Sequence, residues 1–225
     1  MAAPRIALLD YGMGNLRSIE KAIERVGAQA DRTYHPERVR AADGLVLPGV
    51  GAFPKAMSEV RARGFDRLLS ERLAAGVPVL GICLGMQLLF ERSSELGGGE
   101  GLGVLAGEVR PLEAGGLKVP QIGWNAVGWR RPSAITAQLP QPCAFYHVHS
   151  FAPAPADPEA IVGIATYGAE FVSVVARENV FGVQFHPEKS GPDGLALLAG
   201  FARVCGRAAA GARGDGRLGA VAPAA

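Results

Sequence analysis

Val77-Pro-Val-Leu-Gly-Ile-Cys83-Leu-Gly-Met-Gln87 joins a short apolar run to a stretch of helical composition, with glycines two residues before and two residues after Cys83. A short apolar run bounded by a turn predicts a buried strand. We therefore expect a strand over residues 77–82 and a helix over residues 84–92. The turn between them carries a cysteine, so this segment also contains a candidate nucleophile.

The same strand–turn–helix order occurs twice before this segment. Residues 5–10 predict a strand that leads into a helix through residues 16–26, and residues 44–48 predict a strand before a helix that begins near Phe53. This repetition predicts an α/β fold with an open, mostly parallel sheet and helices on both faces. Ligands bind beyond the carboxyl ends of the strands in such sheets, so the turns after these three strands should meet at one rim.

From residue 103 onward the pattern changes to short strand-like runs, which predict a hairpin-rich second half that completes or extends the sheet. The runs cover residues 103–109, 125–129, 144–148, 161–166, 172–177 and 180–185. Residues 192–206 predict a closing helix, so we expect one domain over residues 1–206. The Ala/Gly/Arg-rich remainder, residues 207–225, has no periodicity and is expected to be disordered.

The bulk composition excludes several classes of protein. The chain has 225 residues, 48% of them hydrophobic, which suits one domain with a full core. A net charge of +2 without a basic run gives no reason to expect nucleic acid. No apolar stretch reaches about 18 residues and no signal peptide is evident, so we expect a cytoplasmic protein without a membrane segment. Three scattered cysteines without a CxxC pair predict free thiols in a reducing compartment.

The glycines around Cys83 match a nucleophile elbow, a tight strand-to-helix turn that holds the nucleophile in a strained backbone conformation. The start of a helix favours a thiolate over a thiol. The N–H of Leu84 is a candidate donor to an oxyanion, and Gln87, four residues after Cys83, projects from the same helix face. The alternative is that Cys83 is a small buried apolar residue, as most cysteines in apolar runs are.

A candidate base lies in Val183-Gln-Phe-His186-Pro-Glu188. A cysteine nucleophile needs a group that takes up and returns a proton, and a histidine oriented by a carboxylate can do both. His186 and Glu188 are two residues apart, so in extended backbone they project to the same side, and Pro187 favours that conformation. The alternative is a histidine that ends a strand beside a solvated glutamate.

The other motifs carry less information. His147 and His149 could be metal ligands, but without a third ligand a hydrogen-bonded or packed role is the better interpretation. Val50 and Gly51, in a glycine-bracketed turn after a strand, could supply a second oxyanion donor or simply connect strand and helix. The glycines of residues 10–15 do not match a dinucleotide-binding fingerprint, so we expect no cofactor and no metal site.

Together these segments resemble the class I glutamine amidotransferases and, within that family, the glutaminase subunits of imidazole glycerol phosphate synthases. The resemblance covers about residues 4–206. It rests on two motifs around Cys83 and His186, which occur in the family's order and separation, and on four further segments. These are Asp10-Tyr-Gly-Met-Gly-Asn-Leu-Arg-Ser18, Pro48-Gly-Val-Gly-Ala-Phe53, Gln121-Ile-Gly-Trp-Asn125 and His186-Pro-Glu-Lys-Ser190.

The resemblance implies that Cys83 is the nucleophile, His186 the acid and base, and Glu188 its orienting group. L-glutamine would be hydrolysed through a thioester, with Leu84 and the Val50/Gly51 turn as the oxyanion hole and Gln87 as a substrate contact. Ammonia would pass to a (β/α)8-barrel cyclase subunit that forms imidazole glycerol phosphate and an aminoimidazole carboxamide ribotide in histidine biosynthesis. The residues implied to lie near the docking face are Asn15, Gln121, Trp124, Asn125 and Lys189. Gln121 departs from the family, whose members often carry histidine there.

Three other functions stay open at this point. The chain could serve another synthase, for anthranilate or aminodeoxychorismate, although the Lys189–Ser190 pair and residues 10–18 argue against it. It could be a cysteine peptidase or γ-glutamyl hydrolase with the same fold. It could also be a glutamine sensor or scaffold with an inactive site, which the complete Cys83, His186 and Glu188 set argues against.

Overall fold

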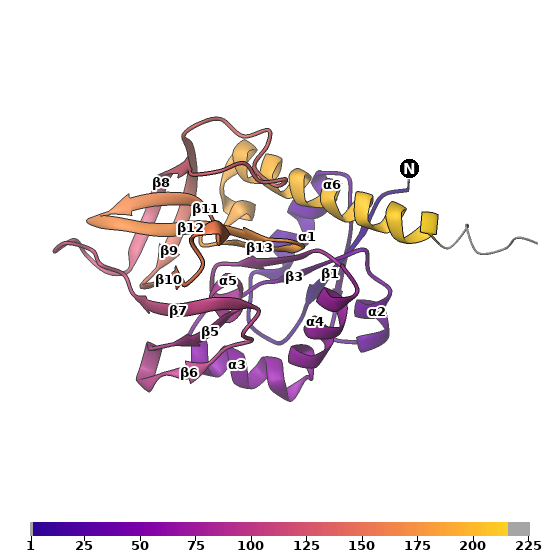
Figure 1. Ribbon diagram of the computed structural model, residues 1–225, viewed down its shortest axis with the longest axis horizontal. Helices are drawn as coiled ribbons and strands as arrows, with labels where there is room; N and C mark the ends of the chain where they lie inside the picture. Colours follow the sequence, from indigo (N-terminus) through magenta and orange to yellow (C-terminus); the bar gives the residue numbers. More distant parts are fainter. Residues whose placement is uncertain (1, 216–225) are drawn as a thin grey trace, which may run out of the picture.

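The computed structural model describes residues 2–215, which form a nine-stranded sheet, a four-stranded sheet and six α-helices (Figure 1). The large sheet has the strand order β2-β1-β3-β4-β13-β12-β11-β8-β9. Its strands are β1 (Arg5–Leu9), β2 (Gln29–Thr33), β3 (Gly44–Leu47), β4 (Val79–Ile82), β8 (Gln121–Trp129), β9 (Cys143–His149), β11 (Ile161–Tyr167), β12 (Ala169–Arg177) and β13 (Val180–Val183). The helices are α1 (Leu16–Arg25), α2 (Pro36–Arg40), α3 (Phe53–Ala62), α4 (Phe65–Ala74), α5 (Leu84–Leu88) and α6 (Gly191–Asp215).

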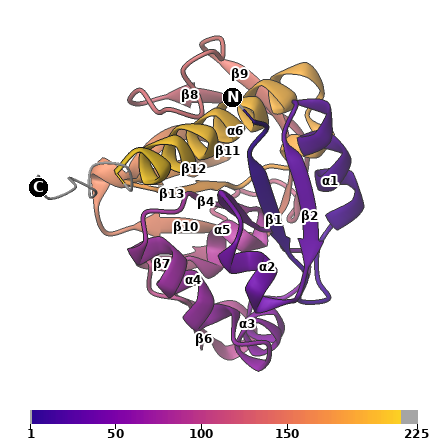
Figure 2. The same ribbon diagram turned by 90° about the vertical axis from the view of Figure 1, so that its right-hand side faces the viewer.

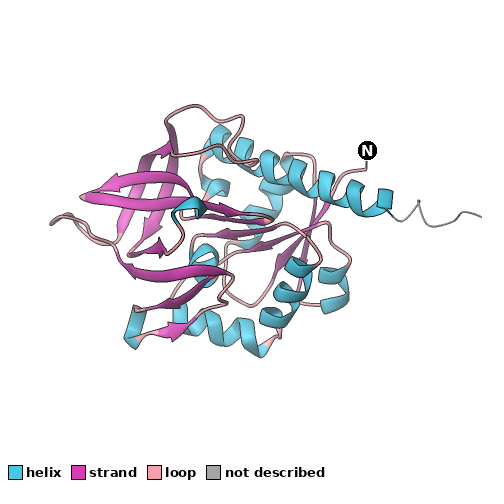
Figure 3. Cartoon of the chain, in the orientation of Figure 1, coloured by secondary structure: helices cyan, strands magenta, loops and turns pink. Residues whose placement is uncertain are grey.

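The two halves of the chain form one continuous mixed sheet. The strands from β2 to β13 in the sheet order pair in parallel, as strand–turn–helix repeats require. The strands from β13 to β9 pair antiparallel, through the hairpins predicted for the second half. The predicted α/β class with helices on both faces is confirmed (Figure 3).

Each face of the parallel half is covered by its own helices, as the end-on view in Figure 2 shows. Ile6 and Leu8 of β1 belong to a core with residues of α1 and α6. Ala7 and Leu9 belong to the opposite core, with residues of α2, α3 and α4. This division follows from the two-residue period of a strand, which sends successive side chains to opposite faces. All four of these side chains are fully buried.

A smaller sheet has the order β10-β7-β5-β6, with β5 (Phe90–Ser93), β6 (Gly99–Glu100), β7 (Leu105–Pro111) and β10 (Phe151–Pro155). It corrects the helix predicted over residues 84–92, because α5 ends at Leu88 and the chain continues as a strand. Phe90 of β5 is buried and pairs with Leu105 of β7. This pairing with a later segment overrides the helical composition of the segment itself.

The closing helix α6 begins near the predicted position but continues to Asp215 rather than ending at residue 206. Its buried residues, such as Leu197 and Phe201, pack on the large sheet. By length and composition, residues 191–212 could cross a bilayer, which the sequence analysis did not anticipate, but a helix that covers the core of a soluble protein passes the same test. Of the predicted disordered tail, residues 216–225 lie outside the described residues.

The turns after β1, β3 and β4 gather at one rim, as expected. The Tyr11 hydroxyl, just after β1, donates a hydrogen bond to the Pro48 carbonyl, just after β3. A Cβ placed on Gly49 would lie 2.9 Å from the Gly85 nitrogen, just after β4. These contacts bring three segments that are far apart in the sequence into one place.

Candidate functional site

Cys83 occupies the strained turn between β4 and α5. Its backbone has φ +53° and ψ −113°, a conformation that a non-glycine residue rarely adopts. Its N–H donates to the Val183 carbonyl at 2.8 Å, and its carbonyl accepts from Met86 and Gln87. These bonds hold the strained conformation in place, which is the arrangement predicted for a nucleophile elbow. The side chain is 6% exposed and lines a cavity.

The flanking glycines are required by close backbone contacts. A Cβ on Gly81 would lie 2.7 Å from the Met86 nitrogen, and a Cβ on Gly85 would lie 1.8 Å from the Leu47 carbonyl oxygen. Real Cβ atoms essentially never come within 3.0 Å of such atoms. The two glycines therefore let α5 pack directly on its own strand and on β3, as the steric argument from the sequence proposed.

The His186 ring lies between Cys83 and Glu188. Its Nδ1–H donates to Glu188 Oε1 at 3.0 Å, and the ring also hydrogen-bonds to the Cys83 sulfur, for which Nε2 is the remaining nitrogen. Burial by itself would lower the pKa of His186, but the hydrogen bonds and charges of Cys83 and Glu188 raise it to about 10. The arrangement therefore favours an imidazolium beside the Cys83 sulfur, held in one orientation by a carboxylate.

Glu188 is itself supported by Asn15 from the start of α1. The Asn15 Nδ2–H donates to Glu188 Oε1 at 3.2 Å, although the resemblance implied only a place near a docking face for Asn15. Asn15 occupies the N-cap position of α1, but its side chain makes no capping hydrogen bond. The Glu188 side chain is 0% exposed, and its Oε2 has no hydrogen-bond partner among the described residues. The buried carboxylate thus depends on Asn15 and His186.

Two glutamine side chains connect the Phe151 carbonyl to the Cys83 sulfur. Gln87 Nε2 donates to the Phe151 carbonyl and to Gln184 Oε1, each at 3.0 Å. Gln184 Nε2 donates to Cys83 Sγ at 3.7 Å. The sulfur also lies 3.7 Å from the Val148 carbonyl oxygen, which accepts from a thiol.

The turn with Val50 and Gly51 lies directly against the elbow. Both residues line the cavity beside Cys83 and Leu84. Among the described residues, no backbone carbonyl accepts a hydrogen bond from the Leu84 N–H. Burial, and then the charge of Cys83, raises the pKa of Tyr11 further above its usual range, so this hydroxyl stays a donor to the turn.

The cavity has a volume of about 290 Å³, enough for a small amino acid. Its lining includes polar and charged side chains, among them Glu95 and Lys189 as well as Cys83 and His186. It is lined by Val50, Gly51, Cys83, Leu84, Gln87, Glu95, Pro120, Val148, His149, Ser150, Phe151, His186 and Lys189. Among residues 2–215, no three or more His, Cys, Asp or Glu side chains are grouped as a metal site would need.

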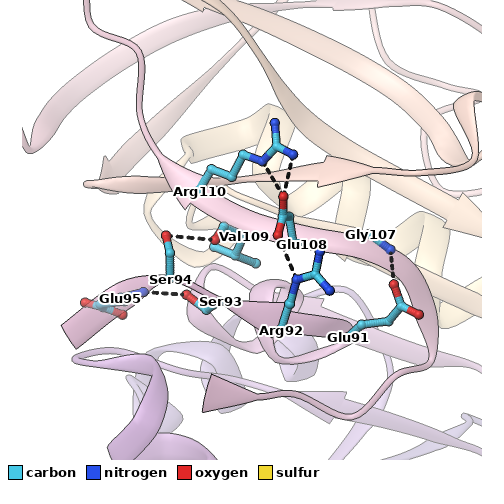
Figure 4. A network of polar contacts seen from close by, with 9 residues as sticks. All are labelled: Glu91, Arg92, Ser93, Ser94, Glu95, Gly107, Glu108, Val109 and Arg110. Carbon is cyan, nitrogen blue, oxygen red and sulfur yellow. Dashed lines mark hydrogen bonds and ion pairs between the residues drawn. The ribbon is translucent and has the colours of Figure 1, made fainter. Parts of the chain in front are cut away.

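Glu95 lines the cavity and belongs to a short 3₁₀ turn after β5. Its backbone N–H donates to Ser93 Oγ at 3.2 Å (Figure 4), and the N–H of Ser94 donates to the Val109 carbonyl of β7. Its carboxylate accepts from the Phe53 N–H at 2.8 Å and so caps α3. The small sheet therefore fixes a carboxylate at the cavity wall and ties it to the start of α3.

His147 and His149 are hydrogen-bonded, as predicted. His147 contacts the Phe145 carbonyl and Ser173 Oγ, while His149 contacts the Phe151 carbonyl and Gln121 Oε1. Burial lowers the pKa of His147 to about 3 and that of His149 to about 4, so both rings are neutral at pH 7. Gln121, placed near a docking face by the resemblance, is only 3% exposed and lies behind the cavity wall.

The other residues predicted for a docking face lie nearer the surface. Trp124 is 59% exposed on β8, next to the exposed Ile122, and Lys189 is exposed at the cavity edge. Asn125 is half-buried and donates to the Thr166 carbonyl. The structure therefore brings an exposed apolar surface close to the Pro120 side of the cavity.

Sequence reasoning missed Gln184, Glu95 and the wall formed by residues 148–151. Gln184 could have been found from the sequence, because a polar residue inside the apolar run before His186 is expected to be buried and therefore to need a hydrogen-bond partner. Glu95 had none, since its position depends on the pairing of β5 with β7.

Comparisons with known proteins agree with this geometry. The family model described as glutamine amidotransferase class-I matches residues 7–204. The chain is 47% identical over 199 residues to the imidazole glycerol phosphate synthase subunit HisH of Moorella thermoacetica, covering 88% of this chain and 94% of the relative. It is 48% identical over 203 residues to the subunit of the same name from Salinibacter ruber, covering 88% and 93%. Among solved structures, one described as a glutamine amidotransferase superposes with a TM-score of 0.71 at 19% identity, covering 89% of this chain and 98% of that one.

Proposed function

Because the chain belongs to the class I glutamine amidotransferase family, we propose that it is the glutaminase subunit of an imidazole glycerol phosphate synthase. In this role it hydrolyses L-glutamine to glutamate and ammonia and supplies the ammonia to a cyclase subunit in histidine biosynthesis. The observation that carries the proposal is the contact of Cys83 with His186 in the wall of a cavity of amino-acid size. A cytoplasmic location and a heterodimer with the cyclase follow from this role.

The three residues would act in sequence. The Cys83 thiolate attacks the side-chain amide carbon of glutamine, and the imidazolium of His186 protonates the leaving nitrogen, which departs as ammonia. A γ-glutamyl thioester remains on Cys83. His186, now neutral, takes a proton from water as the water attacks the thioester. Glutamate is released, and the Cys83 thiolate and the His186 imidazolium are regenerated. Glu188 keeps the ring oriented and stabilises its charged form.

The oxyanion formed in both steps needs two donors. The Leu84 N–H is one, because no described carbonyl uses it and it follows the nucleophile directly. The Val50–Gly51 turn, packed against the elbow, supplies the other. A flip of the peptide between Val50 and Gly51 would add or remove that donor, which is worth about 3–4 kcal/mol of barrier. We expect low activity until the partner and its nucleotide ligand are bound, so that glutamine is not wasted.

The cavity walls fit a free amino acid. Both Nε2 hydrogens of Gln87 are already committed, so its Oε1 is the atom left to accept a hydrogen bond from bound glutamine. The Glu95 carboxylate, which also lines the cavity, offers an anionic partner for the α-ammonium group. Gln87 Oε1 and the Glu95 carboxylate both accept hydrogen bonds, so the cavity favours a substrate that has an N–H group opposite each of them.

The partner would be a (β/α)8-barrel cyclase that uses ammonia to form imidazole glycerol phosphate and an aminoimidazole carboxamide ribotide. Its docking face would include Trp124, Asn125 and Lys189, beside the cavity. Large exposed apolar side chains next to polar ones are typical of such surfaces. Asn15 and Gln121 would act from behind this face, through Glu188 and His149 respectively.

One experiment tests the function directly. The chain mixed with a barrel cyclase and its nucleotide substrate should form imidazole glycerol phosphate from glutamine. Cys83→Ala should abolish synthesis from glutamine but leave synthesis from free ammonium, whereas Cys143→Ala, outside the cavity, should keep both. A Cys83→Ala protein that still uses glutamine would refute the proposal.

Two further assays separate the alternatives. Glutamine hydrolysis should be much faster with the cyclase and its ligand than without them, and equal rates would rule out the Val50–Gly51 switch. Complementation of an anthranilate or aminodeoxychorismate synthase, or cleavage of peptides or folate polyglutamates, would assign the chain to another synthase or to a cysteine hydrolase.

A further inference from the structure

Gln184 is a fully buried amide next to the reacting sulfur, and it has no role in the steps described above. It follows β13 by one residue, and its backbone N–H donates to the Ser173 carbonyl at 2.8 Å. His186 lies two residues further on, so in this extended segment both side chains project to the same side. The two side chains approach Cys83 from the same segment.

The orientation of the Gln184 amide is fixed by its neighbour Gln87. Gln87 Nε2 donates one hydrogen to the Phe151 carbonyl and the other to Gln184 Oε1. Rotating the Gln184 amide by half a turn would place its NH2 group against that of Gln87, two donors without an acceptor. Gln184 Nε2 must therefore face Cys83 Sγ, 3.7 Å away. The Phe151 carbonyl, at the end of this chain of contacts, determines which atom the sulfur meets.

The Cys83 sulfur has two polar contacts at the same distance, and one favours the thiol while the other favours the thiolate. The Val148 carbonyl, 3.7 Å away, accepts from a thiol S–H and repels a thiolate. The Gln184 amide donates to the sulfur and therefore stabilises the thiolate. Gln184 is 0% exposed, so no water competes with the sulfur for its amide.

We propose that Gln184 donates a hydrogen bond to the Cys83 thiolate and keeps the nucleophile ionised against the opposing Val148 carbonyl. This inference rests on the proposed role of Cys83 as the nucleophile. Because Gln184 touches the reacting atom, it is a catalytic residue, and Gln87 and the Phe151 carbonyl are positioning groups that hold its amide. Tyr11 and His186 also interact electrostatically with this sulfur. The other titratable or charged groups that face it are Glu95, His149 and Lys189, which line the same cavity, and Glu188, which lies behind the His186 ring.

The test is the pH dependence of Cys83 alkylation by iodoacetamide, followed by mass spectrometry in the full chain. The other two cysteines, Cys143 and Cys205, are buried away from the cavity, and burial raises the pKa of Cys143 to about 12. Gln184→Met keeps the side-chain volume but removes the hydrogen-bond donor, so the pH midpoint of alkylation should rise by about one unit. At a fixed pH below the midpoint, this shift makes the alkylation about tenfold slower. Gln184→Glu places a carboxylate beside the sulfur and should raise the midpoint further.

Gln29→Met, on the exposed edge strand β2, is the matched control and should leave the midpoint unchanged. If a folded Gln184→Met protein has the wild-type midpoint, the inference is wrong. A measurement on the wild type avoids any folding defect of the variants. The side-chain 15N resonance of Gln184 should titrate with the midpoint found by alkylation and should not do so in Cys83→Ala. The inference is also wrong if the chemical shift of this resonance does not change with pH across the alkylation midpoint. Neither readout requires glutamine turnover, so failure of the proposed function would be seen separately, in the synthesis assay.

Discussion

Gly85→Ala should damage the elbow although it adds a single methyl group. The new Cβ would lie 1.8 Å from the Leu47 carbonyl oxygen and 2.7 Å from its carbon, whereas ordinary contact begins at 3.4 Å. α5 and β3 would have to separate by about 1.6 Å, and neither obstacle is the end of a flexible side chain. Overpacking of this kind costs about 1–3 kcal/mol, and we expect the upper end because the obstacle is backbone.

The same shift would move Leu84, which follows the nucleophile, away from the turn at Val50. A misplacement of about 1 Å in a catalytic site can cost about 10²-fold in rate. We therefore expect kcat/KM for glutamine, measured with the cyclase bound, to fall by about that factor, and the free energy of unfolding in urea to fall by about 3 kcal/mol. Synthesis from ammonium, which bypasses the elbow, should change little.

Gly206→Ala is the matched control, since nothing lies within 4 Å of a Cβ at that position in α6. The same substitution should there stabilise the protein by about 0.5–1 kcal/mol, because alanine is the better helix former. The steric reasoning is refuted if Gly85→Ala has the same free energy of unfolding and the same kcat/KM for glutamine as the wild type.

The remaining predictions concern the supports of the site and its surface. Asn15→Leu removes a donor to the buried Glu188 carboxylate, so the free energy of unfolding in urea should fall by about 1–3 kcal/mol. His149 is held neutral by burial with a pKa of about 4, so between pH 7 and pH 5 only the unfolded chain gains its proton and stability falls. His149→Gln should therefore lose about 2 kcal/mol less stability than the wild type over that interval. Trp124→Ala should weaken cyclase binding by about 2 kcal/mol, or roughly 30-fold in Kd by calorimetry, because exposed tryptophans are frequent anchors.

Each of these changes has a matched control or a contradicting result. Asn125→Leu removes an amide that bonds a carbonyl nearer the surface and should cost less than Asn15→Leu; equal losses would contradict the dependence of the carboxylate on Asn15. Identical pH slopes for the wild type and His149→Gln would mean that this ring is not held neutral. Tyr34→Ala removes an aromatic ring of similar exposure after β2, at the opposite end of the large sheet from β8, and should leave cyclase affinity unchanged.

The parallel half and the central residues of the site could be predicted because local sequence determines them. Cys83 and His186 each follow a short apolar strand, and the rim where such strands end is set by the handedness of the crossovers. The glycines at 81 and 85 revealed the elbow because no other residue fits there. In these places the chemistry and the geometry are encoded within a few residues of each other.

The parts that could not be predicted depend on distant partners. Residues 90–92 belong to the stretch of helical composition, but they lie in β5, which pairs with β7. β2 has mostly polar residues and no clear alternation, and it is a strand because β1 offers it an edge. Glu95 enters the cavity because of the same β5–β7 pairing. Helix α6 continues past residue 206 through a stretch of alanine and glycine that shows no periodicity.

The turn that carries Val50 and Gly51 is anchored at both ends. Tyr11 holds the Pro48 carbonyl on one side, and Glu95 holds the Phe53 N–H on the other. Because the hydrogen bonds lie on either side of the Val50–Gly51 peptide, that peptide could rotate while β3 and α3 stay where they are. The rotation of this peptide plane, proposed above as the response to a docked cyclase, would therefore displace only a few atoms and leave β3 and α3 in place.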